Sequence, residues 1–275
     1  MNPLPLVSII VPTHNSAESL SACLDSITSQ RYPSIELLVV DNHSTDATLE
    51  IARSFTSSVY TQGPERSAQR NKGACAACGA YVAFIDSDMV LAPSVIDHCV
   101  QAISGDPTAK GVYIPERSVG SGFWALCKAL ERSCYVGDDT IEAARFFDRT
   151  SFEAVGGYDE ELTAAEDWDL SQRVARLGSL RHIDAYISHL EGHLTLAEAM
   201  RGKFYYGKSI RRYLRKHHNS TAKQLPIVRP AFLRHWRRLV AQPKFTVGMI
   251  VLRMCEYIAG AAGLISTGLW RERQP

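Results

Sequence analysis

Two carboxylates one residue apart, Asp86 and Asp88, follow directly on the apolar run Tyr81 to Ile85. Such a run is typical of a buried strand in a parallel sheet, whose carboxyl end opens into the crevice where these sheets bind ligands. Two carboxylates this close can share one Mg²⁺ or Mn²⁺, which leaves the other coordination positions to water and substrate phosphates. The pair indicates a metal site for a diphosphate-bearing substrate, although Asp86-Ser87-Asp88 also fits ordinary turn or helix-capping chemistry.

Further acids stand at the predicted ends of other elements. Asp41 ends the apolar run 35–40, which predicts a second strand. Glu166 and Asp167 open a predicted helix, in which Leu170, Val174 and Leu177 are expected to form the buried stripe. Acids in the first turn of a helix are also favoured by the helix dipole, so their position alone assigns them no chemical role.

Strands and helices must alternate along the first half of the chain to place these acids. Apolar runs at 6–11, 35–40, 59–60 and 81–85 alternate with stretches in which apolar residues recur at helical spacing. This alternation predicts βαβ units, and therefore an α/β fold with a Rossmann-like, mostly parallel sheet and flanking helices. No glycine-rich dinucleotide or P-loop sequence follows these runs, so we expect a metal to hold the phosphates.

The composition predicts a folded chain in a reducing compartment. With 275 residues, 45% of them apolar, the chain can bury a full core. Its seven cysteines are odd in number and scattered, with no secretory signal ahead of them. We therefore expect no disulfide framework and a cytoplasmic location.

The net charge of +1 conceals a strong asymmetry. Residues 201–244 hold 13 Lys and Arg and no Asp or Glu, whereas the rest of the chain holds 17 and 29. A segment this basic predicts an anionic partner, either nucleic acid or an anionic membrane surface. No base-reading module is recognisable, so nucleic acid is the less favoured of the two.

The last third predicts helices with apolar faces. A basic amphipathic helix is expected over 204–216, with Arg211, Arg212, Arg215 and Lys216 among aromatic residues. The apolar stretch 245–270 is interrupted by Arg253 and Glu256, and its longest charge-free run, 14 residues, is shorter than the ~20 of a spanning helix. We expect residues 201–270 to lie on a membrane; the alternative is a pair of helices packed on the catalytic domain with a solvated basic face.

Six motifs follow one another along the chain: Pro12-Thr13-His14-Asn15, Val40-Asp41-Asn42-His43-Ser44-Thr45-Asp46, Arg70-Asn71-Lys72-Gly73, Asp86-Ser87-Asp88, Gly156-Gly157-Tyr158-Asp159 and Glu166-Asp167. Their order is the one seen in glycosyltransferase family 2, which the chain resembles over roughly residues 6 to 190. The resemblance implies a GT-A-type fold, a nucleotide-diphosphate sugar donor, Mn²⁺ or Mg²⁺, and inversion at the anomeric carbon.

Positions in these motifs imply roles in donor and metal binding. Asp41 resembles the acid that recognises the base, Asp86 would contact the ribose or the metal, and Asp88 resembles the principal metal ligand. His189, after a predicted strand at 181–187, stands where the family often places a histidine near the metal, with His193 close enough to compete. The full set implied for the nucleotide is Pro12, Thr13, Asn15, Asp41, Arg70, Asp86 and Ser87.

The same resemblance implies which residues are catalytic and which lie on the acceptor side. Asp167 resembles the general base that deprotonates the acceptor hydroxyl, and Glu166 would support or orient it. Gly157, Tyr158 and Trp168 would lie on the acceptor side.

We therefore expect a catalytic domain at 1–194, with a nucleotide-binding half at about 1–115 and an acceptor half at about 116–194. A basic and apolar helical extension is expected at 195–275. The expected function is metal-dependent transfer of a hexosyl or N-acetylhexosaminyl group, with a UDP-sugar as the favoured donor, to a glycan or polyprenyl-linked acceptor. The enzyme would be peripheral on the inner face of the membrane.

Two alternatives stay open. A sugar nucleotidyltransferase would need a glycine-rich, basic loop after the first strand, which Pro12-Thr13-His14-Asn15 does not supply. A catalytically silent scaffold docked on membrane or nucleic acid would have no need for acids at successive strand and loop ends.

Overall fold

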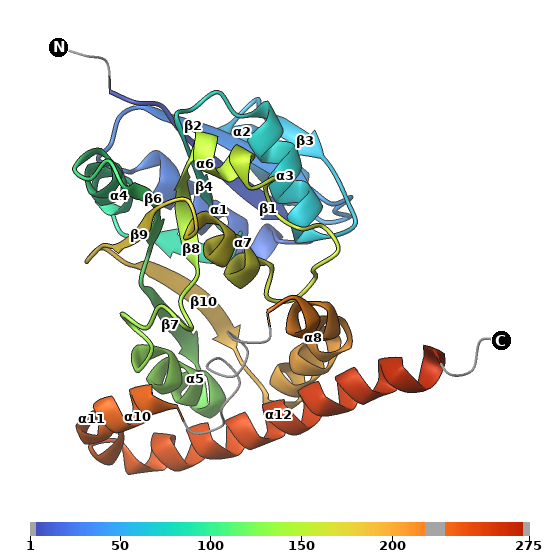
Figure 1. Ribbon diagram of the computed structural model, residues 1–275. Coiled ribbons are helices and arrows are strands. Elements are labelled where there is room, and N and C mark those ends of the chain that lie inside the picture. The colour runs from blue at the N-terminus through green and yellow to red at the C-terminus, as the bar shows by residue number, and fades with distance from the viewer. Residues whose placement is uncertain (1–3, 218–228, 272–275) are drawn as a thin grey trace. The chain divides into compact units, whose positions relative to one another are not determined.

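The computed structural model of the chain describes residues 4–217 and 229–271 (Figure 1). By internal packing the chain divides into two units. Unit 1 comprises Met1–Glu116, Glu142–Glu161 and Glu166–Leu190, and unit 2 comprises Arg117–Ile141, Leu162–Ala165 and Glu191–Pro275. The domain boundary expected at residue 194 stays a prediction.

Unit 1 is built on a seven-stranded sheet of order β3-β2-β1-β4-β8-β6-β9. Strands β1 to β4 are parallel to one another, β8 is antiparallel to both β4 and β6, and β9 is parallel to β6. The mostly parallel sheet predicted from the alternation of elements is confirmed. The strands are β1 (Val7–Thr13), β2 (Ile35–Asp41), β3 (Val59–Thr61), β4 (Tyr81–Phe84), β6 (Ala109–Tyr113), β8 (Ala144–Asp148) and β9 (Ser179–His182).

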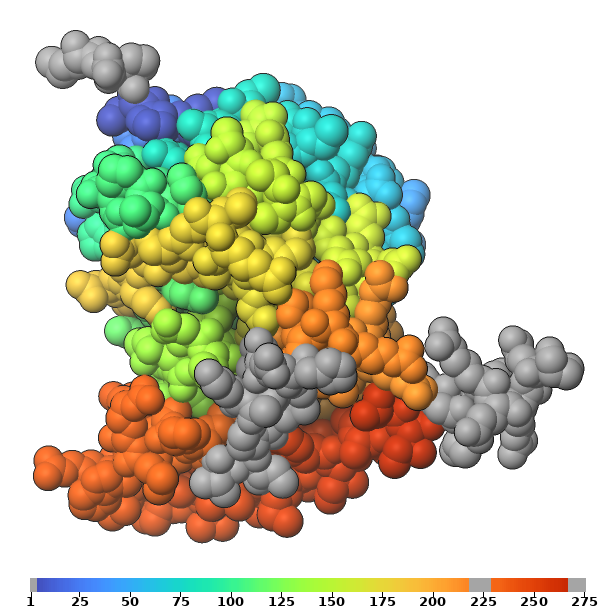
Figure 2. All heavy atoms as spheres, viewed as in Figure 1, coloured from blue at the N-terminus to red at the C-terminus, as the bar shows by residue number. Residues whose placement is uncertain are grey.

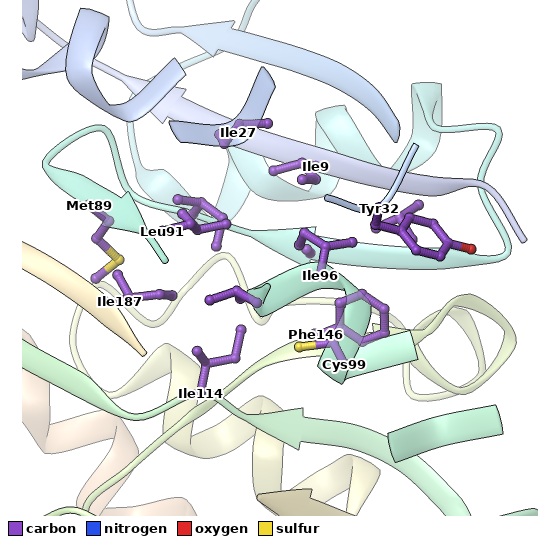
Figure 3. Close-up of a cluster of buried hydrophobic side chains, with 14 of the residues drawn as sticks. Ile9, Ile27, Tyr32, Met89, Leu91, Ile96, Cys99, Ile114, Phe146 and Ile187 are labelled. Atoms are coloured by element: carbon purple, nitrogen blue, oxygen red, sulfur yellow. The ribbon is translucent and has the colours of Figure 1, made fainter. Parts of the chain in front are cut away.

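Two apolar cores lie on the opposite faces of this sheet because successive side chains of a strand point to opposite sides. In β1, Ile9 joins the core under α1, α2 and α4 (Figure 3), whereas Ile10 joins the core under α3, α6 and α7. The result is a three-layer arrangement of helices, sheet and helices. The helices are α1 (Ala17–Thr28), α2 (Thr48–Phe55), α3 (Arg66–Ala76), α4 (Val95–Ser104), α6 (Arg149–Ala154) and α7 (Glu166–Val174).

The carboxyl ends of β1, β2 and β4 lie at one edge of the sheet, since the three strands are parallel and adjacent. Gln69 of α3 is buried there and donates to the carbonyl oxygens of Thr13 (2.9 Å) and Val40 (2.6 Å). β1 and β2 are thereby held together at the edge where Asp41 ends β2.

A short strand β5 (Met89–Leu91) follows this edge and pairs antiparallel with the start of β10 (Ile187–His193). The second half of β10 belongs to unit 2, where Gly192 lies close to Gly120 of β7 (Glu116–Ser121). Two sequence expectations are corrected here. The strand expected at 181–187 is two strands, β9 and β10, and Leu177 lies beyond the end of α7 and is exposed rather than part of its buried stripe.

Unit 2 is mainly helical, and α12 runs along α8 and α5 (Figure 1). Glycines permit close approach: a Cβ at Gly207 would collide with the carbonyl oxygen of Gly260, and one at Gly263 with that of Phe204. The apolar core of this unit joins α5, α10 and α12 through Leu130, Phe232 and Leu252. The helices are α5 (Phe123–Ser133), α8 (Leu196–Lys216), α10 (Pro230–Arg234), α11 (Trp236–Val240) and α12 (Pro243–Arg271).

By length and composition, one helix of the described residues could cross a membrane, over Pro243–Ser266 of α12. The buried helix of a soluble protein can meet the same criterion, so this finding is weak evidence by itself. The expected basic helix at 204–216 is part of α8.

Candidate active site

Arg70 of α3 lies at the centre of the candidate site. Its fully buried guanidinium donates from Nη2 to Oδ1 of Asp86 (2.6 Å), and from Nη1 to Oε1 of Glu166 (3.1 Å) and Oδ1 of Asp167 (2.9 Å). Asp86 follows β4, and the other two acids open α7. The Asp-Ser-Asp segment and the Glu-Asp pair, far apart in the sequence, therefore meet on one guanidinium.

The charges of this cluster set the protonation of its buried acids. Burial by itself raises the pKa of Asp86, but Arg70 and Arg145 outweigh burial and hold that pKa well below its ordinary value. Burial and the neighbouring charge of Asp167 raise the pKa of Glu166 despite the proximity of Arg70. Asp86 is thus held ionised, whereas Glu166 binds a proton more readily than a free glutamate does.

A second buried arginine, Arg145 of β8, reaches Asp86 from another side. Its Nη1 lies 3.3 Å from Oδ2 of Asp86, and its Nε donates to Oε1 of Glu116 at 2.6 Å. Burial alone would lower the pKa of Arg145, but Glu116 and Asp86 raise it above its ordinary value. Both carboxylate oxygens of Asp86 therefore face guanidinium groups.

The pairing of β5 with β10 places His189 beside Asp88. His189 is opposite Met89, the residue after Asp88, and its Nε2 lies 3.1 Å from Oδ2 of Asp88. On the other side of the imidazole, Nδ1 lies 3.7 Å from Oε2 of Glu116. The ring therefore stands between two carboxylates.

These groups fit a divalent cation. Among the residues that the structure describes, the buried Oδ1 of Asp88 has no hydrogen-bond partner. An oxygen that serves as a metal ligand would lack a protein partner in the same way. A carboxylate and an imidazole suit Mn²⁺. The described part of the chain holds no group of three or more His, Cys, Asp or Glu arranged for a metal, so Asp88 and His189 would need further ligands from phosphates and water.

The loops after β1 and β2 meet around Asp41. Asp41 is fully buried and accepts from Oγ1 of Thr13 (2.9 Å) and from the backbone N–H of Ser44 (2.8 Å). Asn15 has φ +48°, a left-handed conformation that asparagine tolerates, and its Oδ1 accepts from the N–H of Thr45 (2.9 Å). The two loops form one hydrogen-bonded layer at the edge where a ligand of the sheet would bind.

The other residues expected to bind the nucleotide lie along the same edge. Pro12 is buried in β1 opposite Val40 of β2, and the hydroxyl of Ser87 donates to that of Ser16 at 2.9 Å. Contacts of these residues with a nucleotide stay predictions.

The ring of Tyr158 packs against the guanidinium of Arg70. The tyrosine is 2% exposed, and its ring centroid lies 5.0 Å from the guanidinium carbon. Its backbone N–H and carbonyl exchange hydrogen bonds with the Asn71 side chain, both at 2.9 Å. Gly157 is needed for this contact because its φ is +68° and a Cβ would lie 2.7 Å from Oδ1 of Asn71.

This geometry bears on the acceptor-side expectation. Tyr158 and Gly157 are buried, whereas Trp168 is half-buried in the first turn of α7, next to Asp167. An acceptor contact for the three residues stays a prediction. Of the two histidines weighed for the metal, His193 belongs to unit 2 and lies beside Gly122, whereas His189 contacts Asp88.

Sequence reasoning missed Glu116 and Arg145. Glu116 comes two residues after the short apolar run ending at Ile114, so it is another acid following a strand. Arg145 is a lone charge in the otherwise apolar Ala144 to Phe147, and a lone charge in a buried strand requires a buried partner. Both signals are present in the sequence, but neither says that the two residues pair.

Comparison with known proteins adds a family match. The family model described as glycosyl transferase family 2 matches residues 8–153. Among curated proteins, "Glycosyltransferase AglE" of Haloferax volcanii is 40% identical over 111 residues, which cover 37% of this chain and 36% of that protein. Chondroitin synthase of Escherichia coli is 25% identical over 196 residues, which cover 66% of this chain and 28% of the synthase.

Solved structures share the fold. A mannosyltransferase from Pyrobaculum calidifontis, solved with GDP-Man and Mn²⁺, superposes with a TM-score of 0.68 at 18% identity, covering 94% of this chain and 88% of that chain. Residues 1–349 of S. aureus TarS, solved with UDP-GlcNAc, give a TM-score of 0.55 at 17% identity, covering 98% and 92%. The chain spans 20% to 36% of the length of the first curated relatives that it matches.

Proposed function

Because the chain belongs to glycosyl transferase family 2, we propose that it transfers a sugar from a nucleotide-diphosphate sugar to an acceptor hydroxyl in one inverting displacement. One observation carries the proposal. Arg70 binds both Asp86, on the side of the donor, and Asp167, the candidate base for the acceptor. A single buried guanidinium thus holds the donor and acceptor carboxylates in one site, as a direct displacement requires.

The donor would lie at the carboxyl ends of β1, β2 and β4, over the layer formed by Thr13, Asn15 and Asp41. We propose a UDP-sugar. Neighbours in fold include one protein solved with a GDP-sugar and one solved with a UDP-sugar, which supports a nucleotide-diphosphate donor of either kind. A panel containing both nucleotides is therefore the appropriate test.

Asp167 would accept the proton of the acceptor hydroxyl. Its side chain is 21% exposed, so an acceptor can reach it, whereas Glu166 is 6% exposed. Arg70 fixes Oδ1 of Asp167, and it also binds Glu166, which accordingly would position the arginine. A base held in this way can stay within hydrogen-bond reach of the attacking hydroxyl.

Asp88 and His189 would hold Mn²⁺ or Mg²⁺, and Asp86, whose two oxygens face Arg70 and Arg145, would contact the ribose or the metal. When bound, the cation would offset the charge that develops on the leaving diphosphate. The neighbour in fold that was solved with Mn²⁺ supports this part of the proposal.

For the acceptor we propose a glycan or a polyprenyl-linked glycan. Relatives over about two thirds of this chain are named hyaluronan synthase and chondroitin synthase, which supports a glycan. A polyprenyl-linked acceptor would place the enzyme on the inner face of a membrane, and α12 is apolar enough for such a location.

The test is calorimetric titration with a panel of UDP- and GDP-sugars, followed by turnover of the binders with membrane extract as acceptor. With Mn²⁺ we expect one class of nucleotide to bind, and chelation should weaken its binding about tenfold or more, or about 1.4 kcal/mol. Asp88→Asn should reproduce the effect of the chelator, whereas Asp184→Asn, at an exposed position, should not. Equal donor affinity with and without chelator would rule out the metal assignment.

Glu116 provides a second test of the metal site. We expect Glu116→Gln to weaken Mn²⁺ binding about 10- to 100-fold, because a carboxylate behind a ligating histidine fixes the ring and raises its basicity. The measurement is Mn²⁺ titration followed by electron paramagnetic resonance, which does not depend on turnover. Glu50→Gln, at an exposed position of α2, is the matched control. Unchanged Mn²⁺ affinity would show that Glu116 serves only Arg145.

A further inference from the structure

The exposed face of α12 is apolar along most of the helix. Measured along the chain, its exposed apolar positions are offset from one another by combinations of three, four and seven residues, so they form one stripe about 27 Å long. Each of these side chains is between 41% and 64% exposed. The members of the stripe are Val247, Ile250, Val251, Met254, Ile258 and Ile265.

The charged residues near the middle of α12 point the other way. Arg253 is 4% exposed and donates to Glu131 and Tyr135, and the carboxylate of Glu256 accepts from Nζ of Lys128 at 2.9 Å. A water-facing helix shows the opposite pattern, with charges outside and apolar residues inside. The charges that interrupt the apolar stretch in the sequence are therefore satisfied within unit 2, and the outer face carries none of them.

The inner face of α12 packs against α8 and α5. Gly263 approaches the backbone of α8, and Gly207 of α8 approaches Gly260, so closely that a side chain at either position would collide, and Leu252 packs in the core shared with α5. Rotating the helix to hide the stripe would break these contacts and leave Arg253 and Glu256 without their partners. The stripe is a fixed surface of the folded unit.

A second group of exposed apolar residues precedes the stripe. Leu233 at the end of α10, and Trp236 and Val240 of α11, are 72%, 55% and 67% exposed. Exposed basic residues stand among them: Arg234, Arg237, Arg238 and, at the start of α12, Lys244. Tryptophan among arginine and lysine is typical of the boundary between lipid headgroups and acyl chains. In Figure 2 these helices are the orange to red atoms.

We propose that the stripe and these three residues form a lipid-docking surface that lies in the plane of an anionic membrane leaflet. The charge of its surroundings identifies the partner. Residues 201–244 contain no acid, and the one acid of α12 before Arg271, Glu256, is buried. An apolar strip that has exposed cations at one end and no exposed acid in its helix fits acyl chains beneath anionic headgroups.

The same charge argues against a second copy of the chain, because the cations of one copy would meet no exposed acid on α10, α11 or α12 of the other. The buried ion network argues against a spanning helix, since crossing would carry Arg253, Glu256 and their partners on α5 into the hydrocarbon layer. The expectation from sequence placed the attachment on residues 201–270. Within that range the structure assigns the main contact to α12, with the cations adding attraction.

The test is co-sedimentation of the full chain with vesicles of phosphatidylcholine, with and without phosphatidylglycerol. We expect binding to the anionic vesicles, and the triple substitution Ile250→Gln, Met254→Gln, Ile258→Gln should lower the partition coefficient about tenfold or more. The matched control, Leu4→Gln, Val119→Gln, Leu177→Gln, changes three exposed apolar residues elsewhere and should bind as the unmodified chain does. Circular dichroism verifies that both variants are folded.

Three outcomes would overturn the proposal: no binding to either vesicle, equal binding by the stripe variant, or self-association without lipid that the stripe variant abolishes. The lipid-docking proposal rests on the proposed function in one respect: a lipid-linked acceptor is the reason for the enzyme to be at a membrane. Donor binding measured without vesicles separates the two. Loss of donor binding with vesicle binding intact would count against the transferase, and the converse would count against this surface.

Discussion

Replacing Asp167 with asparagine is expected to lower turnover about 10²- to 10⁴-fold and to leave donor binding intact. Asparagine keeps the shape of the side chain and an oxygen that can accept from Nη1 of Arg70, so the site should stay assembled. The amide cannot take up the acceptor proton, and this proton transfer is what the variant loses. Turnover at saturating donor and calorimetric donor affinity are the two measurements.

The matched control for this variant is Asp184→Asn, which changes an acid at an exposed position. Turnover of Asp167→Asn near that of the unmodified enzyme would mean that the base lies elsewhere. Glu166 would then be the next candidate. Asp169, the other acid of the first turn of α7, is fully buried and bound to Arg173 at 2.7 Å, and so would be out of reach of an acceptor.

Arg70→Leu is expected to lower the free energy of unfolding by about 3–5 kcal/mol, the range found when one partner of a buried ion pair is removed. Three carboxylates would lose their shared cation; Asp86 would retain Arg145, and Glu166 would retain the more exposed Arg66 at 3.6 Å. Urea denaturation at pH 7 measures the loss, and Arg53→Leu, at an exposed position of α2, is the control.

The pH dependence of this loss has a definite sign. In the unmodified chain Asp86 has a lowered pKa, so its contribution to stability is present above the unfolded pKa of about 3.9 and is lost as the pH falls below it. Without Arg70 the pKa of Glu166 should rise further, and an acid with a raised pKa gains stability as the pH falls. The difference in the free energy of unfolding between the variant and the unmodified chain should therefore become smaller from pH 7 to pH 5. A small loss that is constant with pH would show that the acids do not depend on Arg70.

The sheet could be predicted from sequence because its information is local. The runs at 6–11, 35–40 and 81–85 alternate with helices, and this pattern specifies the parallel order that brings Asp41 and Asp86 to one edge. Element ends were less predictable. Leu177 continues the helical spacing of α7, but the helix ends at Val174, and the spacing carries no sign of that end.

Pairs of charges distant in sequence could not be predicted. Arg253 and Glu256 interrupt the apolar stretch of the last third, yet α12 is one continuous helix because both find partners on α5 more than a hundred residues earlier. The salt bridge of Arg145 with Glu116 is of the same kind. A sequence shows that a buried charge needs a partner, and only the fold shows which residue supplies it.

The position of Arg70 also constrains the order in which the chain can mature during synthesis. Two of its three acid partners, Glu166 and Asp167, lie 96 and 97 residues later, so they leave the ribosome well after β1 to β4 are available to pair. Until then the guanidinium must stay hydrated, because burying it without these acids would be costly. The packing of α3 against the nascent sheet therefore stays incomplete, and the arrival of α7 closes it. For this unit, the emergence of Glu166 and Asp167 and the burial of Arg70 are the same event.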